Sequence, residues 1–159
     1  MIKRVVILDT FPLSSTGKRA PHDGGAATVL DHCQAWVREC VTAGRQVIAP
    51  AIAYYEALRE LERLHAVGQI ARMRAFCNAV PDRYLSLTDE HLERAARLWG
   101  QARNMGVVTA GPEALDGDVI LAAQVQSLGL SPSEYVVATT NVGHLSQFVT
   151  AELWTDVLP

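Results

Sequence analysis

The sequence predicts an α/β domain of three layers (α/β/α), in which a small, mostly parallel sheet lies between two layers of helices. Short apolar segments at residues 5–8, 46–49 and 135–139 have the composition of buried strands. Helical patterns separate these segments, and strands that alternate with helices form parallel sheets. Because 159 residues suit one domain, we predict a single domain over residues 1–159.

The composition indicates a globular protein and narrows its function. Hydrophobic residues make up 49% of the chain, which excludes a disordered protein. The net charge is −3, so any contact with nucleic acid must come from a local basic patch. The three cysteines form no CxxC pair, which argues against a disulfide framework or a zinc site and favours a reducing compartment. The sequence shows no signal-peptide pattern and no membrane-length apolar stretch, so we expect a cytoplasmic protein without membrane contact.

The first predicted strand, at residues 5–8, is rich in β-branched residues and has the pattern of a central strand. It ends at Asp9 and Thr10. Ligands of open α/β sheets bind outside the carboxyl ends of the strands, so Asp9 stands where a functional carboxylate is expected. A turn-forming or helix-capping Asp would have the same position. Residues 11–28 are dense in Gly, Pro, Ser and charge and predict a long loop, whose SSTGKR stretch lacks the residues of a nucleotide-binding loop.

The next patterns predict a helix over residues 29–42, which Gly44 ends, and a strand over 46–49, which Pro50 stops. A second helix follows. Glu56 lies at the edge of its apolar stripe, in the first turns after the strand, and an acid in that position is either paired or functional. The predicted buried stripe of this helix consists of Ile52, Tyr55, Leu58, Leu61 and Leu64.

Two further helices and a short strand are predicted in the middle of the chain. The helices lie at residues 69–79 and 89–105, and the strand lies at 84–87. Thr88 is the predicted N-cap of the second of these helices, and Gly106 ends it. The predicted core-facing residues of that helix are Leu92, Ala95, Ala96, Trp99 and Ala102.

The last third of the chain contains two further candidate polar positions. After a predicted loop at residues 111–116, a helix is predicted over 118–128, and Asp118 heads its apolar stripe. Asp116 is a competing N-cap, which leaves Asp118 without an ordinary explanation. A buried strand at 135–139 runs into Asn141, a second polar cluster at a strand's carboxyl end. A turn at 146–148 and an edge strand at 152–155 complete the prediction.

In a doubly wound sheet, Asp9, Glu56, Asp118 and Asn141 can converge at one edge. Three carboxylates in one cleft repel one another unless a cation lies among them. Ligation by oxygen alone suits Mg²⁺ or Mn²⁺, and the five histidines show no metal-ligand spacing such as HExxH. A site of this kind activates water and stabilises the leaving oxygen in phosphodiester cleavage.

Four segments in matching order make the chain resemble the PIN-domain family, including toxins of the VapC type. They are VVILDT at 5–10, YEAL at 55–58, GDVILAA at 117–123 and TTNVGHLSQF at 139–148. The resemblance implies a metal-dependent endoribonuclease, with Asp9, Glu56 and Asp118 as the metal ligands. Asn141 takes the place of a fourth catalytic residue that is often Asp in the family.

The resemblance also implies supporting residues and partners. Thr139 matches the family's Thr just before the fourth position, and His144 stands where many members have a further Asp. Both departures, at Asn141 and His144, remove negative charge, which would weaken a second metal position or the activity itself. Thr10 and Asp116 are further supporting candidates. The implied partners are an RNA substrate, a cognate antitoxin and a second copy of the chain in a homodimer.

Two alternatives stand beside the PIN-type toxin ribonuclease. The first is a PIN-fold module that binds RNA or a protein with weak or no catalysis, which the two departures favour. The second is an unrelated doubly wound domain that binds a phosphorylated small molecule, which the lack of a Gly-rich phosphate loop disfavours. RNA would need cations near the cleft, unless the basic residues there are ordinary solvated charges. The candidates are Lys18, Arg19, Arg59 and Arg63.

Overall fold

The computed structural model describes residues 3–19, 26–106 and 112–159. Its strands are β1 (Val5–Leu8), β2 (Gln46–Pro50), β3 (Tyr84–Leu85), β4 (Tyr135–Thr139) and β5 (Ala151–Leu153). They form one sheet in the order β3-β2-β1-β4-β5, and every pair is parallel. The first strand is therefore the central one, as predicted.

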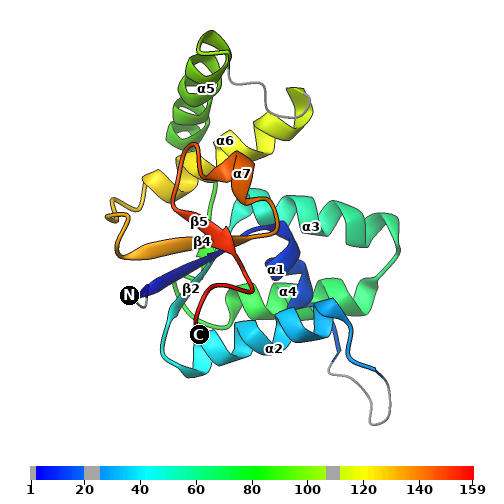
Figure 1. Cartoon of the computed structure of the whole chain (residues 1–159). Helices are drawn as coiled ribbons and strands as arrows, with labels where there is room; N and C mark the ends of the chain where they lie inside the picture. Colours follow the sequence, from blue (N-terminus) through cyan, green and yellow to red (C-terminus); the bar gives the residue numbers. More distant parts are fainter. Residues whose placement is uncertain (1–2, 20–25, 107–111) are drawn as a thin grey trace.

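Helices cover both faces of this sheet. They are α1 (Thr10–Ser15), α2 (Val29–Thr42), α3 (Ala51–Arg63), α4 (Val67–Asn78), α5 (Asp89–Asn104), α6 (Pro112–Gln126) and α7 (Val142–Leu145). Figure 1 shows α2 and α4 on one side of the sheet and α5 and α6 on the other. The predicted three-layer α/β/α fold with a parallel sheet is thus confirmed.

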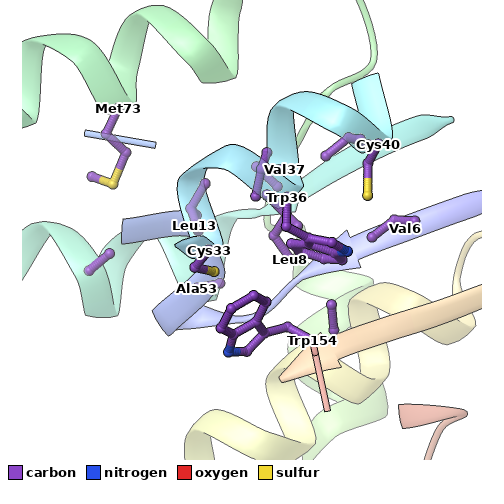
Figure 2. Packing of buried hydrophobic residues seen from close by; sticks show 14 of the residues in the cluster. Val6, Leu8, Leu13, Cys33, Trp36, Val37, Cys40, Ala53, Met73 and Trp154 are labelled. Carbon is purple, nitrogen blue, oxygen red and sulfur yellow. The ribbon is translucent and has the colours of Figure 1, made fainter. Parts of the chain in front are cut away.

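The central strand divides its side chains between two hydrophobic clusters, because successive residues of a strand point to opposite faces. Val6 and Leu8 pack in the cluster that α1 to α4 cover, and Val5 and Ile7 pack in the cluster beneath α6. All four are buried. Figure 2 shows the first cluster, in which Val6 and Leu8 lie near the paired rings of Trp36 and Trp154. Burial on both faces explains the unbroken apolar sequence of β1.

Local sequence signals fixed several boundaries correctly. β1, α2 and β4 have the predicted bounds. Gly44 and Gly106 follow α2 and α5 with φ values of +79° and +68°, a left-handed conformation that glycine adopts without a steric penalty. The predicted cap at Thr88 is confirmed: its hydroxyl accepts from the His91 N–H, and the His91 ring accepts from the Thr88 N–H.

The prediction of a loop from residue 11 is wrong for its first part, because residues 10–15 form α1. Asp9 caps this helix, and Pro12 is tolerated in the first turn, where its missing N–H is not needed. Leu13 is fully buried in the core. The hydroxyls of Ser14 and Ser15 donate to carbonyls three residues earlier, which satisfies them within the helix. Tertiary burial therefore fixes a helix in a segment whose composition predicts a loop.

The buried face of α3 also differs from the predicted stripe. Ala53, Ala57 and Leu61 are buried, whereas the side chains of Tyr55 and Leu64 are 57% and 55% exposed. The two alanines lie in the first cluster, where α3 packs on α1 and α4. Of the predicted stripe, Leu61 is confirmed as buried, whereas Tyr55 and Leu64 lie to the side of this contact.

In α5, only part of the predicted core face is buried. Ala95 and Ala102 are buried, but Leu92, Ala96 and Trp99 are exposed. Among the described elements, α5 packs chiefly on α6, and that contact is made by small residues such as Ala95 and Ala123. A narrow contact of this kind buries one stripe of α5 and leaves the adjoining apolar residues accessible.

Two further differences concern the last third. α6 begins at residue 112, so the predicted start at residue 118 and the predicted N-cap at Asp116 are wrong, and Asp118 lies inside the helix. Residues 142–145 form the short helix α7, which the sequence did not predict. Residue 111 of the predicted loop lies outside the described residues.

Within the residues described, none of the helices combines the length and the apolar character that a bilayer crossing requires.

Candidate active site

Asp9 is fixed at the carboxyl end of β1 by two hydrogen bonds. Its Oδ1 accepts from the Thr10 N–H at 2.7 Å, and its Oδ2 accepts from the Thr139 hydroxyl at 2.6 Å. Thr139 is the last residue of β4, the neighbour of β1 in the sheet, and it is fully buried. The predicted support of Asp9 by Thr10 and Thr139 is therefore present, and it holds the carboxylate in one orientation.

Glu56 is connected to Asp9 through Thr10, although 46 residues separate Thr10 from Glu56 in the sequence. Thr10 Oγ1 donates to Glu56 Oε2 at 2.6 Å. Thr10 thus contacts Asp9 through its backbone N–H and Glu56 through its side chain. The strand β2 pairs with β1, and α3 starts directly after it, so the second turn of α3 reaches the same edge of the sheet.

Asp118 reaches the cluster from α6, with Gly117 as its neighbour. A Cβ atom at Gly117 would lie 2.6 Å from Glu56 Oε1. Glycine inside a helix costs about 1 kcal/mol relative to alanine. The Glu56 carboxylate thus lies against the backbone of α6 at Gly117, and a side chain at this position would displace it.

Asp118 is the most strongly perturbed carboxyl group of the cluster. Its pKa is raised from 3.8 to about 6, first because burial disfavours the charged form and then because of the negative charge of Asp9. Glu56 contributes in the same direction, whereas His144 opposes the shift. His144 Nδ1 lies 3.4 Å from Asp118 Oδ2. Strong perturbation of one carboxyl by neighbouring carboxylates is typical of functional sites.

Asn141 and His144 line the side of the cluster that follows β4. The Asn141 backbone N–H donates to Thr139 Oγ1 at 2.9 Å, so this hydroxyl links Asn141 to Asp9. The Asn141 side-chain nitrogen and His144 Nδ1 are 3.0 Å apart. Asn141, His144 and Asp118 therefore form one contiguous polar chain. Thr10 and Thr139 thus connect Asp9 with Glu56 and Asn141, and the charges of Asp9 and Glu56 both act on Asp118.

A divalent cation would fit the chemistry of this cluster. Oδ2 of Asp118 is buried, and among the described residues the 3.4 Å contact with His144 Nδ1 falls short of a well-formed hydrogen bond to it. Asp9, Glu56 and Asp118 would supply carboxylate oxygens, the ligands that Mg²⁺ and Mn²⁺ prefer. In residues 3–19, 26–106 and 112–159, no three His, Cys, Asp or Glu side chains are already grouped as a metal site.

The candidate cations have different environments. Lys18 forms an ion pair with Asp31 at 2.8 Å, which holds the pKa of that carboxyl well below its usual range. Arg63 pairs with Glu60. Arg59 lies over the ring of Tyr55 in a hollow beside Glu56, and Arg19 is exposed. Arg59 is thus the candidate that shares a hollow with the carboxylates.

Asp116 is exposed and lies on the wall of that same hollow, which Gly117 also lines. Three features of the site were not predicted from the sequence. They are the bond between Thr10 and Glu56, the close approach of Glu56 to Gly117, and the contact of His144 with Asp118. The GD pair inside a helix was the available signal for the second of these.

No protein-family model and no curated protein matches the sequence. Several solved structures share the fold over nearly their whole length. A chain of VapBC2 from Rickettsia felis, bound to a DNA fragment from its promoter, matches with a TM-score of 0.65 and 10% identity, over 94% of this chain and 98% of that chain. A chain of DNA-bound VapBC from Salmonella typhimurium matches with a TM-score of 0.64 and 19% identity, over 97% of this chain and 99% of that chain. A chain of FitAcB from Neisseria gonorrhoeae matches with a TM-score of 0.64 and 18% identity, over 95% of this chain and 99% of that chain.

These likenesses define the class of the protein by its fold. The chain has the fold of proteins found in VapBC toxin–antitoxin complexes, which confirms the PIN-type fold that the sequence resemblance implied. At identities below 25%, the comparison reaches the fold and leaves the chemistry to be argued from the residues of this chain.

Proposed function

We propose that the protein is a metal-dependent endoribonuclease that forms the toxin half of a toxin–antitoxin pair. The observation that supports this proposal most directly is the meeting of Asp9, Glu56 and Asp118 at the carboxyl end of the sheet. They come from three separate segments, and Asp118 has a raised pKa and a buried oxygen that His144 Nδ1 approaches only to 3.4 Å. A bound cation would relieve the repulsion among these groups.

In this proposal, Asp9 and Asp118 hold Mg²⁺ or Mn²⁺, and Glu56 is a third ligand or orients the attacking water. The bound cation would lower the pKa of water and neutralise charge on the phosphate. Thr10 and Thr139 fix the orientations of Glu56 and Asp9 through hydroxyl hydrogen bonds. Asn141, which bonds to Thr139 and contacts His144, is a neutral neighbour that positions a water molecule.

The direct test is a cleavage assay on diverse structured RNAs with protein freed of any antitoxin. The parent should cleave in Mn²⁺ or Mg²⁺ and stop in EDTA. Asp9→Asn keeps a side chain that can cap α1 and should remove nearly all cleavage without unfolding the chain. A parent that cleaves none of these RNAs in either metal would replace the nuclease proposal with the second candidate. That candidate is a PIN-fold binding module, which is favoured by Asn141 and His144 standing where the family often has acidic residues.

The proposal includes two protein partners. Solved neighbours of the fold are VapBC complexes, which supports an antitoxin partner for this chain. A neighbouring gene that encodes a small DNA-binding protein would support the antitoxin partner further. Co-purification of that protein with this chain would test it directly. All three cysteines are free and buried, as expected for a protein that acts on RNA in the cytoplasm.

The second partner is another copy of the chain, bound through α5 and α6. An apolar hollow of about 360 Å³ lies between these helices, with Leu92, Trp99 and Val119 on its walls. Exposed apolar surface of this kind is typical of contact sites. Sedimentation should show a dimer that Trp99→Glu dissociates. Met105→Glu, at an exposed position just after α5, should leave the dimer intact. A monomeric parent would refute this assembly.

A further inference from the structure

A second hollow lies directly beside the carboxylate cluster, between α3 and α6. Its volume is about 370 Å³, and Glu56 and Gly117 belong to both the hollow and the cluster. Ile52 and Ile120 give it an apolar side. Because Glu56 lines it, the hollow is next to the place where a phosphate would meet Asp9 and Glu56. Its volume is within the range of small-ligand sites.

The hollow contains an exposed aromatic ring, Tyr55, and a cation, Arg59, beside it. Tyr55 is 57% exposed, and the guanidinium carbon of Arg59 lies 5.7 Å from the centre of its ring. The adjacent Tyr54 behaves differently, because its ring packs edge-on against Tyr84 at 5.6 Å and its hydroxyl accepts a hydrogen bond from Arg74. Tyr54 is thus part of the packing between elements, whereas the Tyr55 ring is available.

An exposed aromatic ring beside an arginine is the arrangement that binds single-stranded nucleic acid. Bases stack on the ring, and each stacked base contributes about 1–3 kcal/mol by alanine substitution. A cation–π contact at an exposed site is weak, so Arg59 can leave the ring for a phosphate, which its planar fork of donors fits. Arg63, one turn further along α3, is already paired with Glu60 and is less available for this role.

We infer that Tyr55 and Arg59 form a nucleotide subsite that holds the base and phosphate next to the scissile bond of a single-stranded RNA. The inference rests on the proposed nuclease function, because it identifies the substrate of the same site as an unpaired strand. Tyr55 stacks on the base, Ile52 and Ile120 contact its edge, and Arg59 pairs with the adjoining phosphate. The subsite requires an unstacked base, so a double-stranded RNA does not fill it.

The test measures binding apart from cleavage. A short fluorescein-labelled single-stranded RNA of mixed sequence is titrated in Mg²⁺ with protein that bears Asp9→Asn, in which catalysis is removed. In that background, Tyr55→Ala should weaken binding by about 5- to 150-fold, the equivalent of one lost stacking contact. Tyr55→Phe should leave the RNA affinity close to that of the Asp9→Asn protein, because phenylalanine keeps an aromatic ring for stacking. A fully paired RNA of the same sequence should show no dependence on Tyr55.

Arg59→Ala should weaken binding and lower the slope of log affinity against log salt by about 0.7, the contribution of one phosphate contact on a single strand. Arg63→Ala is the matched control on the same helix face and should change neither quantity. Thermal unfolding of each variant checks the fold, and Tyr55 is exposed enough that its loss should leave the melting temperature nearly unchanged.

The outcomes separate this inference from the function on which it rests. If the parent cleaves RNA but Tyr55→Ala binds the strand as tightly as its background, the subsite is refuted and the nuclease stands. If the parent cleaves nothing but binding still falls on loss of the Tyr55 ring, the subsite stands in a binding module. If the Asp9→Asn protein binds no RNA, the subsite is overturned.

Discussion

Replacing Asp118 by Asn should stabilise the metal-free protein at neutral pH, although Asp118 is a proposed ligand. The carboxyl of Asp118 has its pKa raised from 3.8 to about 6, chiefly by burial and by the charge of Asp9. At about 1.4 kcal/mol per pH unit, the shift corresponds to about 3 kcal/mol of unfavourable free energy for the charged form in the folded state. Asn has nearly the same shape without the charge, so up to about 3 kcal/mol should be regained.

The effect of Asp118 on the free energy of unfolding depends on pH, because its pKa differs between the folded and unfolded states. Above pH 6 the carboxyl is charged in both the folded and unfolded states, and the full penalty is present. As the pH falls from about 6 toward 4, the folded state takes up a proton before the unfolded state does, so stability rises. Below about 3.8 both states are protonated and the penalty is gone. The difference between Asp118→Asn and the parent should therefore be largest at pH 7 and vanish near pH 4.

Urea unfolding in EDTA across this pH range measures the effect, because other titrating groups largely cancel in the difference between the two proteins. For a chain of this length, each kcal/mol corresponds to about 2–4 °C in melting temperature. Asp116→Asn is the matched control, an exposed carboxylate two residues earlier on α6, and should change stability by less than about 0.5 kcal/mol. A destabilised Asp118→Asn at pH 7, or a difference independent of pH, would refute the argument from repulsion and burial.

Three further predictions concern the same cluster. Gly117→Ala should add up to about 1 kcal/mol to the stability of α6 while lowering RNA cleavage, because the new methyl group displaces the Glu56 carboxylate; unchanged cleavage by a stably folded variant would contradict this. Millimolar Mn²⁺ or Mg²⁺ should raise the melting temperature of the parent, and the rise should vanish in Asp118→Asn; a parent without any rise would count against a cation site. Asn141→Asp should keep or raise cleavage, since it adds a carboxylate beside the proposed cation, and a loss as complete as that of Asp9→Asn would reveal a specific role for the amide.

Features that depend on neighbouring residues in the chain could be predicted from the sequence. β1 and β4 are buried on both faces, so their apolar runs are unbroken and their ends are visible. The alternation of strands and helices fixed a parallel sheet, and a parallel sheet places all carboxyl ends at one edge. Asp9 directly follows β1 and Asn141 comes two residues after the end of β4, so the sequence predicted that both lie at this edge of the sheet.

Features that depend on contacts between distant segments were decided by the tertiary structure. α1 forms in a loop-like sequence because Leu13 is buried in the core, and the large residues Tyr55 and Trp99 remain exposed because alanines make the helix contacts. The Glu56 carboxylate, 61 residues earlier in the chain, lies where a side chain at Gly117 would be, a contact that only the folded chain makes. The raised pKa of Asp118 has the same origin, since burial and the charge of Asp9 exist only once the chain has folded. Sequence periodicity records which face of an element is apolar, but packing decides what that face meets.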